Sequence, residues 1–566
     1  MMSGNSQKKF HHPGAGRRHA PALPKGRQID PDAVAEIAAL LDEKPLVRDR
    51  LIEYLHVIQD RFHGLAPRHM AALADLMRLS LVEVFEVATF YAHFNVARED
   101  DTHLPAVTVR VCDSLPCMLA GGDALYDALE SGLGSSDIHI VHAPCMGRCD
   151  CAPVVEVGHR HIDRADADAV SETISTGDTG TKMPPYPALK RALLDGAYSI
   201  FKSCISGQRS YDSVRATIEK SGLRGMGGAG FPAFRKWDFV NAEDGPRAVV
   251  INADEGEPGT FKDRYFLERT PHGVLEGALI AAWAVDAKEL WIYLRDEYPV
   301  AREILQTEIA AIEAEGIVGP GFIRLRRGAG AYICGEESAL IESIEGKRGL
   351  PRHRPPYVAQ NGVFGLPTLV HNVETAFWIR EILHAGASWY SEQGRNGHSG
   401  ARAFSVSGRV REPGVKIAPN GITVRQLINE YCGGMADGHS FTAYLPGGAS
   451  GGILPASMGD LPLAFGALEA HGCLVGSGAV VVLSDQDSVR NAAVNLMRFF
   501  EDESCGQCTP CRVGTAKAVK LMQARAWDKN LLGELSAAMR DASICGLGQA
   551  APNPMDSVLR YFSDEA

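Results

Sequence analysis

The sequence predicts a multidomain protein of the α/β and α+β classes. Its 566 residues are enough for about three or four domains, and its 45% apolar and 22% charged content is ordinary for a globular chain. Helical and strand periodicities alternate along the chain. A stretch rich in Ala, Asp, Thr, Gly and Pro, at residues 163–187, separates a smaller N-terminal part from a larger C-terminal part.

The composition argues against two classes of protein. The chain has no run of eighteen apolar residues, and the apolar run at 278–285 is too short to span a bilayer. A net charge of −12 argues against nucleic acid as the main partner. We therefore expect a cytoplasmic protein with no direct membrane insertion and no nucleic-acid partner.

The first 29 residues differ from the rest because they are basic. No acidic residue precedes Asp30, and the stretch lacks the apolar core of a secretory signal. It could be a disordered tail or a basic arm that packs on a partner subunit. We predict the disordered tail.

The N-terminal part predicts a helical bundle followed by a small α/β domain. Residues 30–97 carry helical periodicity, and Ser80 with Glu83 resembles a capping box. Residues 104–170 contain strands at 107–111, 138–141 and 154–157 and a helix at 124–129, with cysteines at the strand ends. A linker at 171–188 is expected to follow.

The C-terminal part predicts three further units. Residues 189–395 form an α/β body with buried strands at 247–252 and 289–294 and a helix at 300–315. Residues 400–485 are more β-like and end in a strand at 479–483. Residues 486–566 are helical and are interrupted by a cluster of cysteines.

Two neighbouring stretches in the α/β body predict a ligand site. Residues 225–237 begin with four glycines in six positions, which lets the backbone approach a flat or anionic ligand. Residues 252–264 are rich in acid, which would repel a phosphate unless it faces a ribose, a carboxamide or a ring N–H. The alternative is a tight surface turn beside a charged loop.

Two groups of cysteines predict metal sites. Cys505, Cys508 and Cys511 are spaced to wrap one face of a cubane, and Cys545 can supply the fourth ligand, which favours [4Fe–4S] over zinc. The spacing of Cys112 and Cys117 with Cys145 and Cys149 fits zinc or [2Fe–2S] about equally well. Cys151 could be a bystander, and the remaining cysteines are expected to be buried structural thiols.

A nucleotide loop between two metal sites predicts an electron relay. Iron–sulfur centres pass single electrons, whereas nicotinamide passes a hydride. A flavin can hold two electrons and release them singly, so the chemistry predicts FMN or FAD.

Several motifs resemble the FMN- and NADH-binding subunit of the respiratory complex I family. These are residues 225–237, 252–264, 328–338, 371–375, 504–512 and 543–548. The resemblance covers about residue 189 to the C-terminus and implies FMN, NAD(H) and a [4Fe–4S] cluster. It also implies an FMN-binding α/β domain, a ubiquitin-like β-grasp (SLBB) domain and a C-terminal helical bundle.

The N-terminal part resembles the 24-kDa subunit of the same complex. Residues 55–59, residues 83–91 and the four cysteines carry this resemblance, which implies a [2Fe–2S] cluster on a thioredoxin-like fold. Both modules in one chain resemble the diaphorase subunit of soluble, NAD-dependent, metal-containing formate dehydrogenases. Residues 112–121 and 143–149 are more similar to that group than to complex I.

The resemblance also implies roles for individual residues around the glycine loop. The loop and its positive charges would come from Arg224, Gly225, Gly227, Gly228, Gly230 and Lys236. Phe231 and Phe239 would stack on the bases of NADH; for Phe239 the alternative is a core aromatic. Two positions depart from the family pattern, since His371 stands where Asn is expected and Met226 where Arg is usual.

The remaining residues would hold the flavin and the nicotinamide. Hydrogen bonds to FMN are implied for Asn252, Asp254, Glu255, His371, Asn372 and Thr375, and Tyr332, Gly335 and Glu336 would complete the pocket. The catalytic carboxylates would be Glu255, Glu257 and Glu337, with Glu257 facing the nicotinamide carboxamide and Glu337 on the NADH side. Hydride transfer needs stacking, orientation and electrostatics rather than an acid–base residue.

We therefore expect the diaphorase subunit of a formate dehydrogenase, an NADH:acceptor oxidoreductase. Its partner would be a large subunit with a molybdenum or tungsten pterin and further iron–sulfur clusters. The alternatives are the diaphorase of an NAD-reducing hydrogenase, a complex I module, and a non-catalytic assembly subunit that keeps its clusters for structure.

Overall fold

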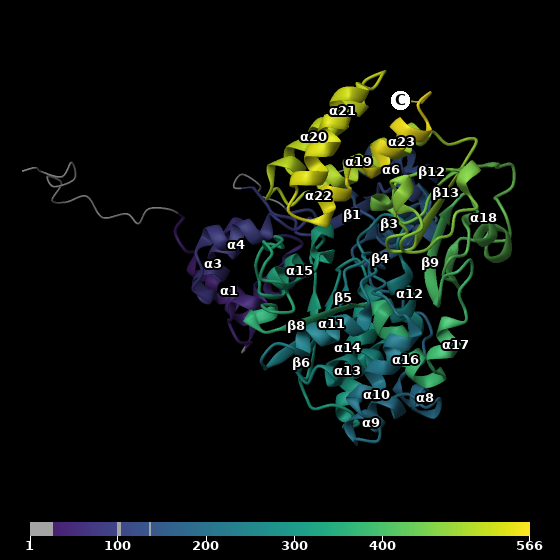
Figure 1. The fold of residues 1–566 in the computed structure, drawn as a ribbon. Helices are drawn as coiled ribbons and strands as arrows, with labels where there is room; N and C mark the ends of the chain where they lie inside the picture. Colours follow the sequence, from purple (N-terminus) through teal and green to yellow (C-terminus); the bar gives the residue numbers. More distant parts are fainter. Residues whose placement is uncertain (1–26, 43, 99–103, 135–136, 566) are drawn as a thin grey trace, which may run out of the picture.

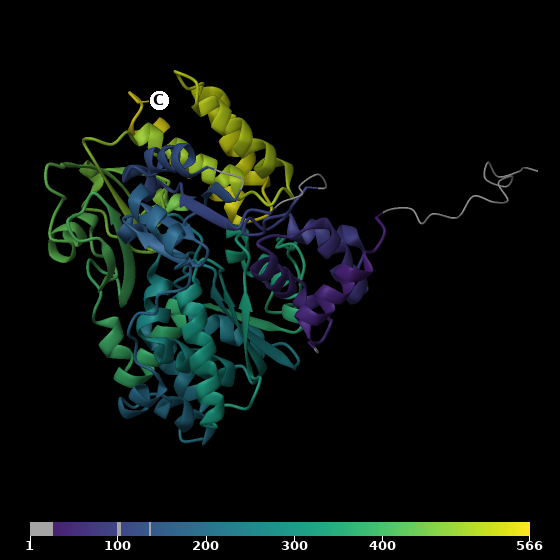
Figure 2. The same ribbon diagram turned by 180° about the vertical axis from the view of Figure 1, so that it is seen from behind.

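The computed structural model describes residues 27–42, 44–98, 104–134 and 137–565. Most of the predicted tail at 1–29 lies outside the described residues. Within the described part of the chain, no helix is long and apolar enough to cross a membrane. Figures 1 and 2 show the N-terminal helices at one side of the molecule, the large α/β body below, and the C-terminal helices above it.

The described part of the N-terminal bundle has four helices and is joined to the α/β body by ion pairs. The capping box is confirmed, because Ser80 Oγ accepts from the backbone N–H of Glu83 while Glu83 accepts from that of Ser80. Arg326 of the body forms ion pairs with Asp49 and Glu53 of the bundle. The helices are α1 (Pro31–Leu41), α2 (Leu51–Phe62), α3 (Pro67–Met77) and α4 (Leu81–Ala88).

The next domain is a four-stranded sheet in the order β2-β1-β3-β4. Strands β1 (Val107–Cys112) and β2 (Ile138–Ala143) are parallel, and β3 (Val154–Val157) and β4 (Arg160–Asp163) continue the sheet antiparallel. Helices α5 (Leu115–Leu119) and α6 (Gly122–Leu133) follow β1. The three predicted strands are confirmed, and β4 was not predicted.

The expected linker begins later than the sequence indicated. Residues 167–176 form helix α7 (Ala167–Thr176), because Asp166 caps the backbone N–H of Ala169 and Val170 is buried beneath the sheet domain. The glycines and prolines that make this stretch resemble a linker all lie after the helix, at 177–187. The chain becomes irregular only after Gly177, and 178–188 leads into the body.

The central body is a parallel sheet in the order β7-β6-β5-β8, covered by helices. The predicted strands and the predicted helix at 300–315 are confirmed. The strands are β5 (Arg247–Ala253), β6 (Ala287–Leu294), β7 (Ile323–Arg327) and β8 (Thr368–Asn372). The helices are α8 (Leu189–Leu194), α9 (Ser199–Ile205), α10 (Tyr211–Ser221), α11 (Ala233–Asn241), α12 (Lys262–Arg269), α13 (Pro271–Ala284), α14 (Pro299–Ala314), α15 (Glu337–Ile344), α16 (Val373–Ala385) and α17 (Ala387–Ser391).

A second sheet and a helical bundle complete the chain. The sheet has the order β10-β9-β13-β11-β12, with β13 parallel to β9 and the other neighbours antiparallel, as in a β-grasp. Its elements are β9 (Ala401–Gly408), β10 (Gly414–Pro419), α18 (Val424–Gln426), β11 (Phe441–Leu445), β12 (Leu454–Pro455) and β13 (Ala479–Ser484). The bundle contains α19 (Val489–Asp502), α20 (Thr509–Met522), α21 (Lys529–Ala542), α22 (Gly546–Ala550) and α23 (Asn553–Tyr561).

Candidate functional site

A cavity of about 830 Å³ opens at the carboxyl ends of β5 and β8. These strands are adjacent and parallel, and their last paired residues are Asn252 and Asn372. Chain order reverses between them, because β5 leads to β6 and β7 on one side while β8 lies on the other. Such a switch point is where open α/β sheets bind ligands.

Most of the predicted cofactor residues line this cavity. They are Gly225, Gly227, Gly228, Gly230, Phe231, Lys236, Phe239, Asn252, Gly335, Glu336, Glu337, His371 and Asn372. The structure therefore brings together segments that are more than a hundred residues apart in the sequence. The two stretches singled out from the sequence contribute unequally, since the acid-rich one supplies only Asn252.

The glycine loop is closed by its own backbone and held from behind. Gly225 N–H donates to the carbonyl of Phe231 at 2.8 Å. Arg224 donates to the carbonyl of Gly230, and Thr375 Oγ1 accepts from the N–H of Met226 at 2.9 Å. Arg224 and Thr375 do not line the cavity, so they fix the shape of the loop from outside it. Met226 is buried, so its side chain adds no charge to the cavity.

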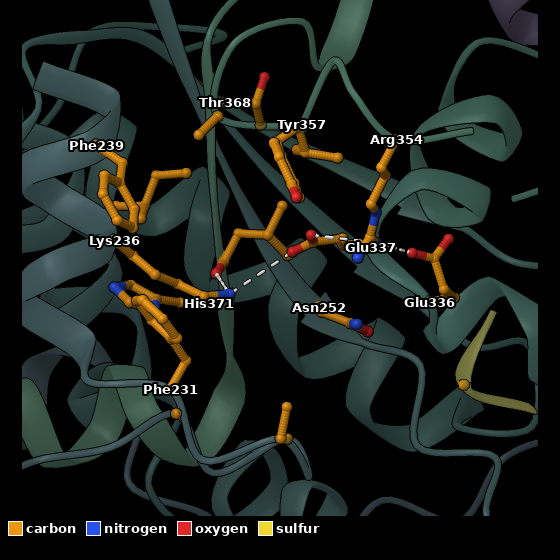
Figure 3. A pocket seen from close by; sticks show the side chains of 18 of the residues that line it. Phe231, Lys236, Phe239, Asn252, Glu336, Glu337, Arg354, Tyr357, Thr368 and His371 are labelled. Carbon is orange, nitrogen blue, oxygen red and sulfur yellow. Dashed lines mark hydrogen bonds and ion pairs between the residues drawn. The ribbon is translucent and has the colours of Figure 1, made fainter. Parts of the chain in front are cut away.

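Two aromatic rings stand on the glycine-loop side of the cavity (Figure 3). The ring centroids of Phe231 and Phe239 are 5.9 Å apart, and the guanidinium of Arg235 lies over both. Phe239 is 48% exposed, so the core-aromatic alternative is wrong. An exposed aromatic pair beside a cavity is suited to stacking on a planar base.

Charged side chains face each other across the cavity. Lys236 on α11 lies 3.6 Å from Glu337, and Arg354 pairs with both Glu336 and Glu337 (Figure 3). Arg354 and Tyr357 also line the cavity, although the sequence motifs do not indicate them; they come from an irregular segment between α15 and β8. The proline-rich run 351–356 was the available signal, because it predicts an ordered non-helical segment.

His371 is a neutral hydrogen-bond acceptor at the cavity wall. Its Nε2 accepts from the indole N–H of Trp237 at 2.8 Å, which requires an unprotonated Nε2. Burial, with a smaller contribution from the charge of Lys236, lowers the pKa of His371 from 6.5 to about 3. Its Nδ1 is therefore the protonated nitrogen at neutral pH.

This histidine should make the fold sensitive to acid. Below pH 6.5 the unfolded chain binds a proton at His371 that the folded chain excludes until about pH 3, so stability is lost as the pH falls through this window. Between pH 7 and pH 5, the free energy of unfolding of H371N should fall by about 2 kcal/mol less than that of the parent. Urea titrations between pH 4 and 7 measure this.

The control for this comparison is H384N, which changes an exposed histidine at the end of α16. It should unfold with the same pH dependence as the parent. An equal acid sensitivity of H371N and the parent would show that His371 is not a neutral buried group.

Four more of the predicted residues are not among those that line the cavity. Glu255 accepts from the backbone N–H groups of Asp263 and Arg264 and from Tyr298, while Glu257 accepts from Ser450 and Ser477 of the β-grasp domain. Neither carboxylate lines the cavity. Burial raises the pKa of Glu255 to about 8, and burial also raises that of Glu257. Both carboxylates are thus held by donors of the protein, and their contact with a ligand stays a prediction.

Asp254 and Tyr332 are the other two of these four predicted residues that do not line the cavity. Tyr332 packs between Gly256 and Phe499 of α19. Burial raises the pKa of Asp254 well above its ordinary value, and within the described residues its Oδ2 has no hydrogen-bond partner. A carboxyl group in this state suits a ring N–H or hydroxyl of a bound ligand.

These residues fit FMN. The φ of Gly228 is 136°, and a side chain added there would meet no protein atom within 4 Å, so the loop leaves space for a flat ligand. The wall adds Lys236 for a phosphate and Asn252 and Asn372 for polar edges. The volume also suits a second planar ligand beside the first.

The C-terminal cysteines gather around a second, small cavity. It is lined by Cys505, Cys508, Cys511 and Cys545 together with apolar side chains that include Ile333 and Leu547. Cys545, Ile544 and Pro351 line both this cavity and the large one. A single wall therefore separates the predicted [4Fe–4S] ligands from the predicted flavin pocket.

The N-terminal cysteines converge at the ends of β1 and β2. Cys112, Cys117, Cys145 and Cys149 are all buried, and Sγ of Cys145 lies 3.3 Å from Sγ of Cys149. Cys151 is more exposed than these four. Cys204, Cys334, Cys432 and Cys473 are buried, as expected for structural thiols.

Three family models match successive parts of the chain. Residues 37–177 match the thioredoxin-like [2Fe–2S] ferredoxin, residues 218–381 the Nuo51 FMN-binding domain, and residues 491–566 the NADH-ubiquinone oxidoreductase-F iron–sulfur binding region. The chain therefore carries binding domains for FMN, NAD(H), [2Fe–2S] and [4Fe–4S], as predicted. The choice of [2Fe–2S] over zinc is confirmed by the first match.

Curated proteins and solved structures match larger parts. The F subunit of the NADH-quinone oxidoreductase of Aquifex aeolicus is 40% identical over 401 residues, which are 68% of this chain and 92% of that protein. The mitochondrial NADH-ubiquinone oxidoreductase 51 kDa subunit of Neurospora crassa is 39% identical over 67% of this chain and 81% of its own length. A crystal structure of an NAD+-reducing [NiFe]-hydrogenase in the H2-reduced state matches with a TM-score of 0.80 and 32% identity over 92% of each chain.

Proposed function

This chain belongs to the family of the NADH-ubiquinone oxidoreductase 51 kDa subunit, and we propose that it is the diaphorase subunit of a metal-dependent, NAD-linked formate dehydrogenase. The family fixes the coarser function, an NAD(H)-dependent flavin and iron–sulfur oxidoreductase subunit. The partner that we propose is a large subunit with a molybdenum or tungsten pterin.

The observation that carries the electron-relay function is the wall shared by the two cavities. Cys545 lines both the large cavity and the cavity of the C-terminal cysteines, so a residue that would hold the [4Fe–4S] cluster also forms part of the wall that would hold the flavin. Bound FMN supplies the conversion between a two-electron hydride and single electrons. The chain supplies the orientation of its ligands and their separation from water.

The proposed residue roles follow from the cavity walls. Phe231 and Phe239 would stack on the nucleotide, while Lys236 would neutralise a phosphate. Glu336 and Glu337 are held by Arg354, which keeps their carboxylates at the cavity edge. The aromatic pair, Phe231 and Phe239, and the carboxylate pair, Glu336 and Glu337, lie on opposite sides of the cavity (Figure 3). A ligand bound between the two pairs would therefore be held in one orientation.

Two observations support the formate dehydrogenase assignment. The [2Fe–2S] module and the FMN module occur in one chain, and all four N-terminal cluster cysteines are present and converge.

None of the described cysteines is in a disulfide, which supports our proposal of a cytoplasmic location. The likeness to an NAD+-reducing hydrogenase over nearly the whole chain supports a second candidate, the diaphorase of such an enzyme.

Purification of the native complex tests the partner. A co-purifying large subunit that contains molybdenum or tungsten supports the formate dehydrogenase, whereas nickel supports the hydrogenase. The isolated chain should oxidise NADH with an artificial acceptor and should not oxidise formate. Formate oxidation by the isolated chain would contradict the assignment.

A further inference from the structure

The loop that carries the [2Fe–2S] ligands Cys145 and Cys149 packs closely against the central α/β body, near the flavin pocket. Gly147, between Cys145 and Cys149, has a φ of 62°, and a Cβ there would lie 2.1 Å from the hydroxyl oxygen of Tyr298. The same Tyr298 donates to Glu255 at 2.9 Å. The cluster loop and the acid-rich segment therefore share one buried contact region.

Arg295 joins these two segments directly. It follows β6, is 3% exposed, and its Nη2 donates to the carbonyl of Cys145 at 2.5 Å. Its Nη1 donates to the carbonyl of Glu255. One guanidinium thus connects the backbone of a cluster ligand to the backbone of the segment that follows Asn252 and Asp254.

The surroundings of Arg295 fix its side chain. Its Nη2 also pairs with Glu297 at 2.7 Å, and the guanidinium lies over the ring of Tyr298 at 5.1 Å. Its Nε is buried and has no partner among the described residues. Arg264 makes a separate contact with this loop, donating to the carbonyl of Gly147 at 2.8 Å, so Arg295 is the arginine that reaches the cluster ligand itself.

We propose that Arg295 is a positioning residue that holds the Cys145 loop against the part of the α/β body next to the flavin pocket, and that it raises the midpoint potential of the [2Fe–2S] cluster. The proposal rests on the flavin position inferred above. A permanent positive charge beside a cluster favours the reduced cluster, which carries one more negative charge. Glu297 opposes this effect, because its carboxylate accepts from the same Nη2, but only the guanidinium bonds to the backbone of Cys145.

Redox titration of the intact flavin- and iron-containing chain tests the proposal. We expect R295M and R295Q to lower the ratio of reduced to oxidised [2Fe–2S] at a fixed potential about tenfold, equivalent to a midpoint about 59 mV more negative. R295K keeps the positive charge but cannot donate to the carbonyls of Cys145 and Glu255 at the same time. Its midpoint should therefore shift less than those of R295M and R295Q. Electron paramagnetic resonance of the [2Fe–2S] signal, with chemical reductants, measures the ratio.

The matched control is R402M, which removes another fully buried arginine, in β9 of the β-grasp sheet. Its [2Fe–2S] midpoint should equal that of the parent. An iron-replete R295M or R295Q with the parental midpoint would overturn the proposal, and so would equal shifts in R295K and R295M. If R295M does not assemble the cluster, the midpoint of R295Q is the measurement that decides the proposal. Since chemical reductants replace NADH and formate, this outcome is independent of the proposed partner.

Discussion

C545A should lose the [4Fe–4S] cluster and with it electron transfer to the partner subunit. Cys545 is one of the four cysteines around the small cavity and supplies the ligand that closes the set from thirty-four residues beyond Cys511. The iron content should fall by about four of about six atoms per chain, because the [2Fe–2S] site is separate. Iron analysis and electron paramagnetic resonance of both clusters measure this.

C473A is the matched control, since Cys473 is a buried thiol in the β-grasp domain and lines neither cavity. It should keep both clusters and normal transfer to the partner. A C545A protein with full iron and undiminished transfer would contradict the assignment of Cys545 as a ligand and as the contact between the two sites.

K262M should destabilise the protein by about 3–5 kcal/mol, because it leaves two buried carboxylates without their cation. Lys262 is 1% exposed and pairs with Asp263 at 2.7 Å and with Glu374 at 3.1 Å. It also donates to Asn372, which in turn donates to Asp263 at 2.5 Å. The same change should therefore lower flavin content, since Asn372 lines the cavity.

Urea unfolding with a parallel flavin assay measures both effects. K347M is the control, because Lys347 is 39% exposed and its partners Glu342 and Glu345 both keep Arg352 as a second cation. It should cost no more than about 1 kcal/mol. Equal stability of K262M and K347M would show that the buried lysine does not balance the charges of the site.

Local patterns in the sequence were sufficient for much of the fold and of the cluster sites. The strands at 247–252 and 289–294 are short apolar runs bounded by polar residues, and they form the centre of the parallel sheet. The cysteines were predictable because cluster ligands follow fixed short spacings. Helix α7 is not evident from the sequence because the glycines and prolines at 177–187 dominate the composition of the stretch, whereas the Asp166 cap and the packing of Val170 stabilise the helix.

The acid-rich segment shows what neighbours in the sequence leave undetermined. Asn252 lies at the end of β5 and faces the cavity, but Glu255 turns to the N-terminus of α12. Glu257 is bound by serines from the β-grasp domain, about two hundred residues away. No local pattern reveals a hydrogen bond to so distant a partner, so the sequence could not predict which protein groups hold these carboxylates.

Arg354 and Tyr357 show the opposite failure. They line the cavity from a segment without regular structure, which has no periodicity that could indicate its direction. Only the packing of this segment against β8 and α15 brings it over the site. The sequence could therefore predict the glycine loop and the carboxylates that face it, but not Arg354 and Tyr357.

Anaerobic titration of the isolated chain with NADH tests the central claim most directly. The account predicts a yellow protein with bound FMN, whose visible absorbance bleaches on addition of NADH and whose [4Fe–4S] cluster becomes reduced in the same titration. A protein with full iron but no flavin, or with a flavin that NADH does not bleach, would contradict the account and would favour a non-catalytic subunit that keeps its clusters for structure.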